Sequence, residues 1–145
     1  DLTLKAGPRA WARVATSAFD RHQADVIVAE VNFGGAMVRE VLRAARPQTP
    51  FKAVTASRGK VVRAEPFSAL FDDGRVRMVG HMRELEDELC GMTSNGYVGE
   101  ASPNRADAMV WALTELFPGV VRAVRREEKR EPETYVEHSG SWMAA

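Results

Sequence analysis

The sequence has little of what stabilises secreted or membrane-embedded proteins. Its 145 residues include a single cysteine, Cys90, which excludes an internal disulfide framework and suits a reducing compartment. No apolar run approaches the roughly 18 residues that a membrane-spanning helix needs, so we expect no membrane partner. Twenty basic residues balance twenty acidic ones at a net charge of +0. Because no overall basic field favours nucleic acid, any DNA binding must come from a local patch.

Several common catalytic motifs are also absent. No glycine-rich loop ends in Lys-Ser or Lys-Thr, which excludes a nucleotide-hydrolysis site of the P-loop type. The three histidines have no companions at metal-ligand spacing, and Cys90 is interpreted as a structural thiol beside an apolar helix face. The acidic run at 84–89 is rejected as a metal site, because its carboxylates fall mainly on the outer face of an amphipathic helix.

What is present is an alternation of helix and strand patterns over a length suited to one domain. The predicted elements are a helix at 8–22, a strand at 26–31, a helix at 36–45, a strand at 51–55, a helix on either side of Pro66 that ends at 72–74, a strand at 75–79, a helix at 82–92, a loop at 91–99 and a helix at 102–116. Residues 26–29 are apolar without alternation, as in a parallel strand covered on both faces. The order predicts an α/β fold.

The last predicted helix and the segment after it differ sharply in composition. Ser102 is placed to cap the helix, Pro103 suits its first position, and residues 108–116 are apolar almost all round, which predicts burial. Residues 120–145 are charged and contain little core material. We therefore predict a folded segment at 1–119 and a flexible tail at 120–145.

Two carboxylates are the candidate site residues. Glu30 ends the first strand, and ligands of open parallel sheets bind beyond the carboxyl ends of the strands. Asp107 lies in a helix predicted to be buried, where a carboxylate must be paired, protonated or bound to metal. An ion pair with an arginine explains each residue alone. Together, they are the oxygen ligands that Mg²⁺ or Mn²⁺ prefers.

Polar and basic residues accompany these acids in sequence. Asn32, Gly34 and Gly35 follow Glu30, and glycines there either bring backbone amides to an anion or simply permit a tight turn. After the second strand come Arg58, Lys60 and Arg63, on the same predicted edge of the sheet as Glu30. These three residues either contact DNA phosphates or form an ordinary solvated surface.

Four stretches resemble a known family: DVIVAEVNFGGAMVREVLR, KAVTASRGKVVRAEP, ELEDELCGM and GYVGEASPNRADAMVWALTEL. From about Trp11 to Leu116, the chain resembles the C-terminal nuclease domain of tailed-phage terminase large subunits, and is most similar to those of prophages and gene transfer agents. The resemblance implies an RNase H-like fold, with a partial mixed sheet and flanking helices. It also implies an endonuclease that cuts concatemeric double-stranded DNA during packaging in the cytoplasm of the bacterial host, with a terminase small subunit and a portal protein as partners.

The same resemblance implies that three acids hold two divalent metals, with Glu30 as the second acid and Asp107 as the third. The first acid of the family lies on the opening strand of the domain. No residue here matches that acid, because Asp1 directly precedes the first predicted helix. Two alternatives remain open: another RNase H-like nuclease such as a junction resolvase, or a non-catalytic DNA-binding or docking module.

We predict that this chain by itself does not cleave DNA, because the first acid has no match in it. The measurement is nicking of plasmid DNA in Mg²⁺ or Mn²⁺. Robust cleavage by this chain that Glu30→Ala abolishes would contradict the prediction. A preference for four-way junctions over linear duplex would instead favour the resolvase alternative. Salt-dependent DNA binding without Mn²⁺ binding would favour the non-catalytic one.

Overall fold

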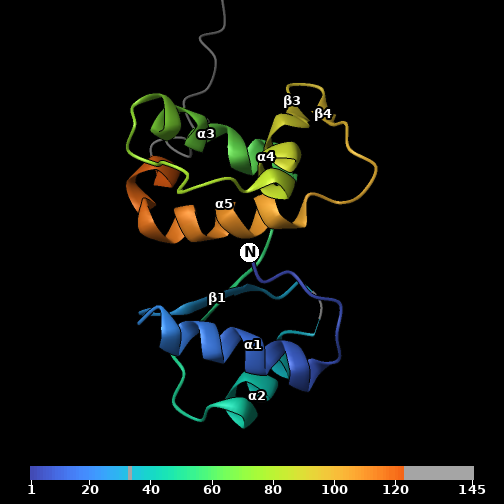
Figure 1. Cartoon of the computed structure of the whole chain (residues 1–145), viewed down its shortest axis with the longest axis vertical. Coiled ribbons are helices and arrows are strands. Elements are labelled where there is room, and N and C mark those ends of the chain that lie inside the picture. Colours follow the sequence, from blue (N-terminus) through green and yellow to red (C-terminus); the bar gives the residue numbers. More distant parts are fainter. Residues whose placement is uncertain (33, 123–145) are drawn as a thin grey trace, which may run out of the picture.

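The computed structural model describes residues 1–32 and 34–122 (Figure 1). Along the chain, the elements are α1 (Pro8–Arg21), β1 (Ile27–Glu30), α2 (Gly35–Ala45), β2 (Phe51–Val54), α3 (Lys60–Asp72), α4 (Arg83–Cys90), β3 (Met92–Thr93), β4 (Gly96–Tyr97) and α5 (Asn104–Leu116). The predicted mixture of helix and strand is confirmed, and most predicted elements lie within a residue or two of the observed ones.

The sheet that positions the site consists of β1 and β2, which pair in parallel as the sequence predicted. The register places Ile27 opposite Phe51 and Glu30 opposite Val54. Both strands therefore end at the same edge, and the loops that follow them begin side by side. The apolar residues of β1 are half-buried rather than fully covered.

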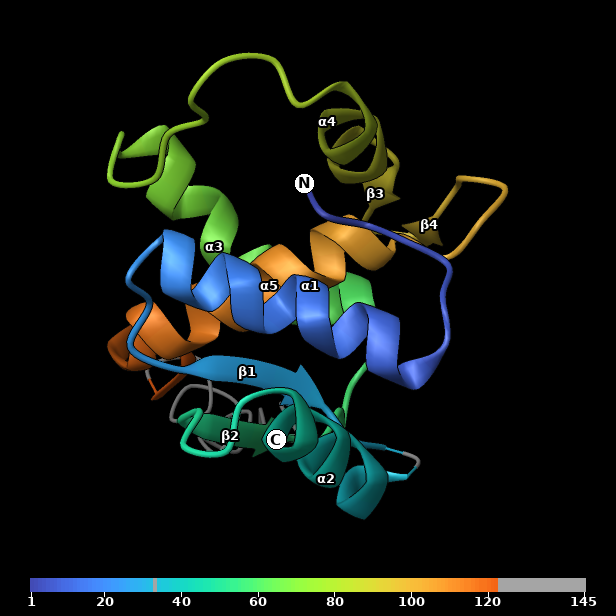
Figure 2. The same ribbon diagram turned by 60° about the horizontal axis from the view of Figure 1, so that its bottom comes forward.

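Helices cover this sheet on opposite sides. On one side, α1 and α2 pack against each other (Figure 2). Each of these helices has a fully buried apolar residue, Ala12 on α1 and Leu42 on α2. From the other side, α5 contacts β1 (Figure 1). The carboxyl edge of the sheet therefore faces the helical part of the chain, and α5 is the element that joins the two.

The helical part has its own apolar core between α3 and α5. Four buried residues form it: Phe67, Leu70, Val110 and Leu113. As predicted, α3 runs through Pro66, which supplies no backbone donor but leaves the rest of the helix intact. This core fixes α3 on α5 and thereby fixes which side chains of the two helices meet.

The strand predicted at 75–79 is wrong. The amides of Arg75 and Val76 donate to the carbonyl of Leu70 at 2.9 and 3.0 Å, so they close the end of α3 instead of entering a sheet. Gly74, with φ at +65°, makes that reversal possible. Instead of one mixed sheet, the described residues form two separate two-stranded sheets.

The loop predicted at 91–99 is also wrong, because it contains the hairpin β3–β4. The strands are antiparallel and pair Met92 with Tyr97 and Thr93 with Gly96. Asn95-Gly96 is a typical hairpin signal that the sequence analysis passed over. The preceding helix is shorter than predicted, because Met92 belongs to the hairpin and Met82 precedes the first helical residue.

Five details around α4 and α5 differ from the predictions made from the sequence. Pro103 precedes α5 instead of occupying its first position, and the side chain of Ser102 does not cap the helix. The helix is buried along one face only, since Leu116 is 71% exposed. Cys90 is exposed and is not a packed structural thiol. Glu88 points toward α5 and accepts a hydrogen bond from the amide of Ala106 at 2.9 Å.

Val120 and Val121 pack against the α3–α5 core, just beyond the predicted boundary at 119. Residues 123–145 of the predicted flexible tail at 120–145 lie outside the described residues. The division into a folded segment at 1–119 and a tail at 120–145 therefore stays a prediction. Within residues 1–32 and 34–122, no helix is long and apolar enough to cross a membrane.

Two leucines on α5 test the one-sided burial of this helix. Leu113 is 6% exposed and Leu116 is 71% exposed. We predict that Leu113→Ala lowers the free energy of unfolding by about 2–4 kcal/mol, because it leaves a cavity in the core. The matched control, Leu116→Ala, changes it by no more than about 0.5 kcal/mol. Urea denaturation measures both, and equal losses would contradict the assigned faces of α5.

Candidate functional site

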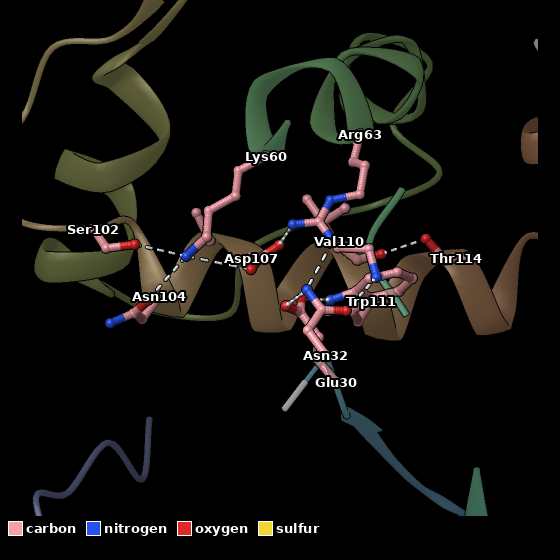
Figure 3. Close-up of polar contacts among 12 residues, drawn as sticks. Glu30, Asn32, Lys60, Arg63, Ser102, Asn104, Asp107, Val110, Trp111 and Thr114 are labelled. Atoms are coloured by element: carbon pink, nitrogen blue, oxygen red, sulfur yellow. Dashed lines mark hydrogen bonds and ion pairs between the residues drawn. The ribbon is translucent and has the colours of Figure 1, made fainter. Parts of the chain in front are cut away.

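Glu30 stands at the carboxyl end of β1, where its side chain leaves the sheet toward α3 and α5 (Figure 3). Both carboxylate oxygens are engaged. Oε1 accepts a hydrogen bond from Asn32 Nδ2 at 2.7 Å. Oε2 accepts one from Trp111 Nε1 at 2.8 Å and one from Arg63 Nη1 at 3.2 Å. The strand end is therefore tied directly to both helices.

Asp107 approaches the same place from α5. It lies in the first turn of the helix, its amide donates to the carbonyl of Pro103 at 3.0 Å, and the residue is only 8% exposed. Oδ1 accepts from Arg63 Nη2 at 2.7 Å, and Oδ2 lies 3.3 Å from Lys60 Nζ. Two positive side chains thus compensate the charge of this buried carboxylate, as its burial requires.

Arg63 is the residue that brings the two acids together. One nitrogen of its guanidinium donates to Glu30 and the other donates to Asp107, while the ring of Trp111 lies 4.7 Å from the guanidinium carbon. Its side chain is only 10% exposed. The planar fork of donors on arginine allows this double contact, which a lysine cannot reproduce. This arginine is buried, and is not part of the solvated surface that the sequence also allowed.

Lys60 begins α3 and reaches the start of α5. Its Nζ donates to Ser102 Oγ at 2.7 Å and to Asn104 Oδ1 at 2.9 Å, in addition to its contact with Asp107. Two carboxylates and two cations therefore balance in charge within the cluster formed by Glu30, Asp107, Lys60 and Arg63.

Asn32 connects the loops that follow the two strands. Besides its bond to Glu30, its Oδ1 accepts from the amide of Ala56 at 2.9 Å. Gly34 has φ at +72°, and a Cβ on Gly35 would lie 3.0 Å from the Cβ of Val31. Backbone geometry therefore requires both glycines, which supports the turn explanation of the sequence pattern.

The third predicted basic residue, Arg58, lies in the loop between β2 and α3. It lines a cavity of about 110 Å³ next to the cluster, together with Arg63, Trp111 and three hydroxyl-bearing residues: Thr55, Ser57 and Thr114. Predicted site residues from both strand ends and both helices thus lie around one place, and DNA binding by any of them stays a prediction.

The sequence analysis did not assign Trp111, Ser102 and Asn104 to the site. The signal for Trp111 was available, because it lies four residues after Asp107 and hence on the same face of α5. Ser102 and Asn104 had no such signal. Their contact with Lys60 spans more than forty positions and depends on how α3 packs on α5.

The donor chemistry of the site fits a divalent cation only in part. Glu30 and Asp107 supply the carboxylate oxygens that Mg²⁺ and Mn²⁺ prefer. Among residues 1–32 and 34–122, however, no three His, Cys, Asp or Glu side chains come together in a way that could hold a metal ion. Arg63 also uses one oxygen of each carboxylate. The described residues therefore do not form a two-metal centre.

Comparison with known proteins gives one match. The model of the family described as "Terminase RNaseH-like domain" matches residues 5–116 of the 145-residue chain. No curated protein and no solved structure matches it. The matched range includes both acids, both cations and the helices and strands from α1 to α5.

The indole of Trp111 offers a test of how the strand end is held. We predict that Trp111→Phe destabilises the chain by on the order of 1 kcal/mol, because Glu30 loses a hydrogen-bond donor and is itself about one-third exposed. The matched control is Trp11→Phe on α1, outside the site. Both are measured by urea denaturation. If Trp111→Phe costs as much in the Glu30→Ala background, where the acceptor is absent, as it does in the unmodified chain, the proposed bond is refuted.

Proposed function

The chain belongs to the terminase RNaseH-like domain family, and from this membership we propose that it is the nuclease module of a DNA-packaging terminase. The proposed reaction is endonucleolytic cleavage of concatemeric double-stranded DNA. The proposed ligands of the divalent cation, Mg²⁺ or Mn²⁺, are Glu30 and Asp107.

One observation supports this proposal above the others. Glu30 and Asp107 come from different elements, 77 positions apart, yet both contact the same buried guanidinium. A purely structural ion pair needs only one acid for one arginine. A second acid at the end of a parallel strand is the arrangement expected where ligands bind α/β sheets.

Each residue of the cluster has a definable role in this proposal. Glu30 and Asp107 hold the cation, which supplies Lewis acidity toward a phosphodiester when it is bound. Asn32 and Trp111 orient the Glu30 carboxylate through the bonds described above. Lys60, anchored by Ser102 and Asn104, keeps positive charge beside Asp107. A complete two-metal centre needs a further acid in addition to these two residues.

The DNA contacts are proposed to come from the loop after β2 and the start of α3. Arg58, Lys60 and Arg63 lie at the carboxyl edge of the sheet, and cationic side chains position a phosphate backbone. The charges of Lys60 and Arg63 are balanced there by Glu30 and Asp107, so the proposed contact requires that these ion pairs loosen. Gly34 and Gly35 shape the neighbouring turn. The proposed partners are double-stranded DNA, a terminase small subunit and a portal protein, in the cytoplasm of a bacterial host.

A second candidate is a non-catalytic DNA-binding or docking module. It is favoured by the full engagement of both carboxylates with cations, which leaves the cluster charge-neutral. The two candidates differ in whether loss of an acid changes DNA cleavage or only changes DNA affinity.

We predict that Glu30→Gln and Asp107→Asn each abolish Mn²⁺-dependent cleavage, because each removes a charged oxygen donor while keeping the shape of the side chain. Cleavage of linear duplex is measured with the longest natural protein that contains this chain, because the chain by itself is predicted not to cleave DNA. Glu115→Gln is the matched control, since Glu115 also lies on α5 but pairs with Lys52 outside the site.

The control is expected to cleave like the unmodified protein. Cleavage that survives in either site variant would contradict the assignment of that acid. If the longer protein does not cleave DNA under any condition but still binds DNA in a salt-sensitive way, the non-catalytic module is favoured.

A further inference from the structure

We infer that Arg63 and a divalent cation exclude each other between Glu30 and Asp107, so that Arg63 sets the affinity of the acid pair for metal. This inference rests on the proposed function, because it concerns the same two carboxylates. It adds a regulatory role for a residue that the sequence pattern assigned either to a DNA contact or to a solvated surface.

The geometry places Arg63 where a shared cation would have to bind. Its two terminal nitrogens reach Glu30 Oε2 at 3.2 Å and Asp107 Oδ1 at 2.7 Å. Within the described residues, it is the one cation that contacts both carboxylates. A metal ion bound by both acids would need oxygen contacts of roughly 2.0–2.6 Å and would lie against the positive guanidinium. The two positive groups would repel each other strongly in a site of low exposure.

The charge balance also works against a second cation. With Lys60 and Arg63 in place, the two carboxylates have no net negative charge to offer a dication. Lys60 does not compete with a shared metal ion in the same way, because Asp107 is the one of the two acids that it contacts. Its ammonium group is also held by Ser102 and Asn104. Displacement of Arg63 therefore restores negative charge to both acids at once.

Two features of its surroundings favour movement of the Arg63 side chain away from the two carboxylates. Its Nε is buried and has no hydrogen-bond partner among the described residues. The cavity of about 110 Å³ that Arg63 lines is bounded mainly by apolar surface, but its lining includes the hydroxyl-bearing residues Thr55, Ser57 and Thr114. These three hydroxyl groups are able to accept hydrogen bonds from the guanidinium when the carboxylates bind metal.

The test is Mn²⁺ binding to the full 145-residue chain, by calorimetry and by the shift in Tm that Mn²⁺ produces. We expect Arg63→Gln to bind Mn²⁺ at least about tenfold more tightly than the unmodified chain, with a larger rise in Tm on adding Mn²⁺. Glu30→Gln in the Arg63→Gln background removes this gain. The matched control, Arg39→Gln, alters an arginine on α2 that lies over Phe51, and leaves Mn²⁺ affinity unchanged.

Arg63→Gln leaves two neighbouring carboxylates less compensated, so it is paired with Arg63→Lys, which keeps the charge but lacks the planar fork of donors that spans the two acids. If Arg63→Gln is unfolded without metal, Arg63→Lys still has to bind Mn²⁺ more tightly than the unmodified chain. If the unmodified chain and both Arg63 variants bind Mn²⁺ with equal affinity, and Glu30→Gln abolishes that binding, then the proposed exclusion is wrong but Glu30 remains a metal ligand. If no folded variant binds Mn²⁺, both the proposed exclusion by Arg63 and the assignment of the acids as metal ligands are wrong.

Discussion

The double contact of the Arg63 guanidinium is the interaction on which the described structure depends most. It joins Glu30, at the end of β1, to Asp107, in the first turn of α5. The sheet and the helical part meet mainly where α5 contacts β1, and this bridge lies at that meeting point. The side chains of Arg63 and Asp107 are about nine-tenths covered, and loss of one partner from such a pair typically costs about 3–5 kcal/mol, because the remaining charge stays uncompensated. The Arg63–Asp107 pair therefore constrains the arrangement strongly, whereas Glu30 is more exposed.

The same bridge connects fold and proposed function. Membership of the terminase RNaseH-like domain family provides the nuclease context, and the convergence of two acids at a strand edge provides a location for the chemistry. The structure adds that these acids are already neutralised by Arg63 and Lys60. Binding of metal and retention of the arginine are then alternatives, so the contact that assembles the two carboxylates also limits their use.

Much of the fold was predictable because local patterns agree with the final packing. Uninterrupted apolar residues at 26–29 indicated a parallel strand, and the strand pairs that way. The strand expected at 75–79 failed because Gly74 turns the chain back and the next two amides close α3. The small hairpin at 92–97 shows no alternation pattern, because each strand has only two residues, and Asn95-Gly96 was its one available signal.

The sequence by itself determined which residues carry the candidate chemistry and the edge at which they gather, since strand ends and helix faces follow from local periodicity. Only the tertiary structure decided which partners they choose. Arg63 could have reached solvent or a phosphate, but the α3–α5 core points it between two acids that lie far apart in the chain. Trp111 likewise reaches Glu30 because α5 packs on β1. Long, flexible side chains take their partners from packing, and packing is a property of the whole fold.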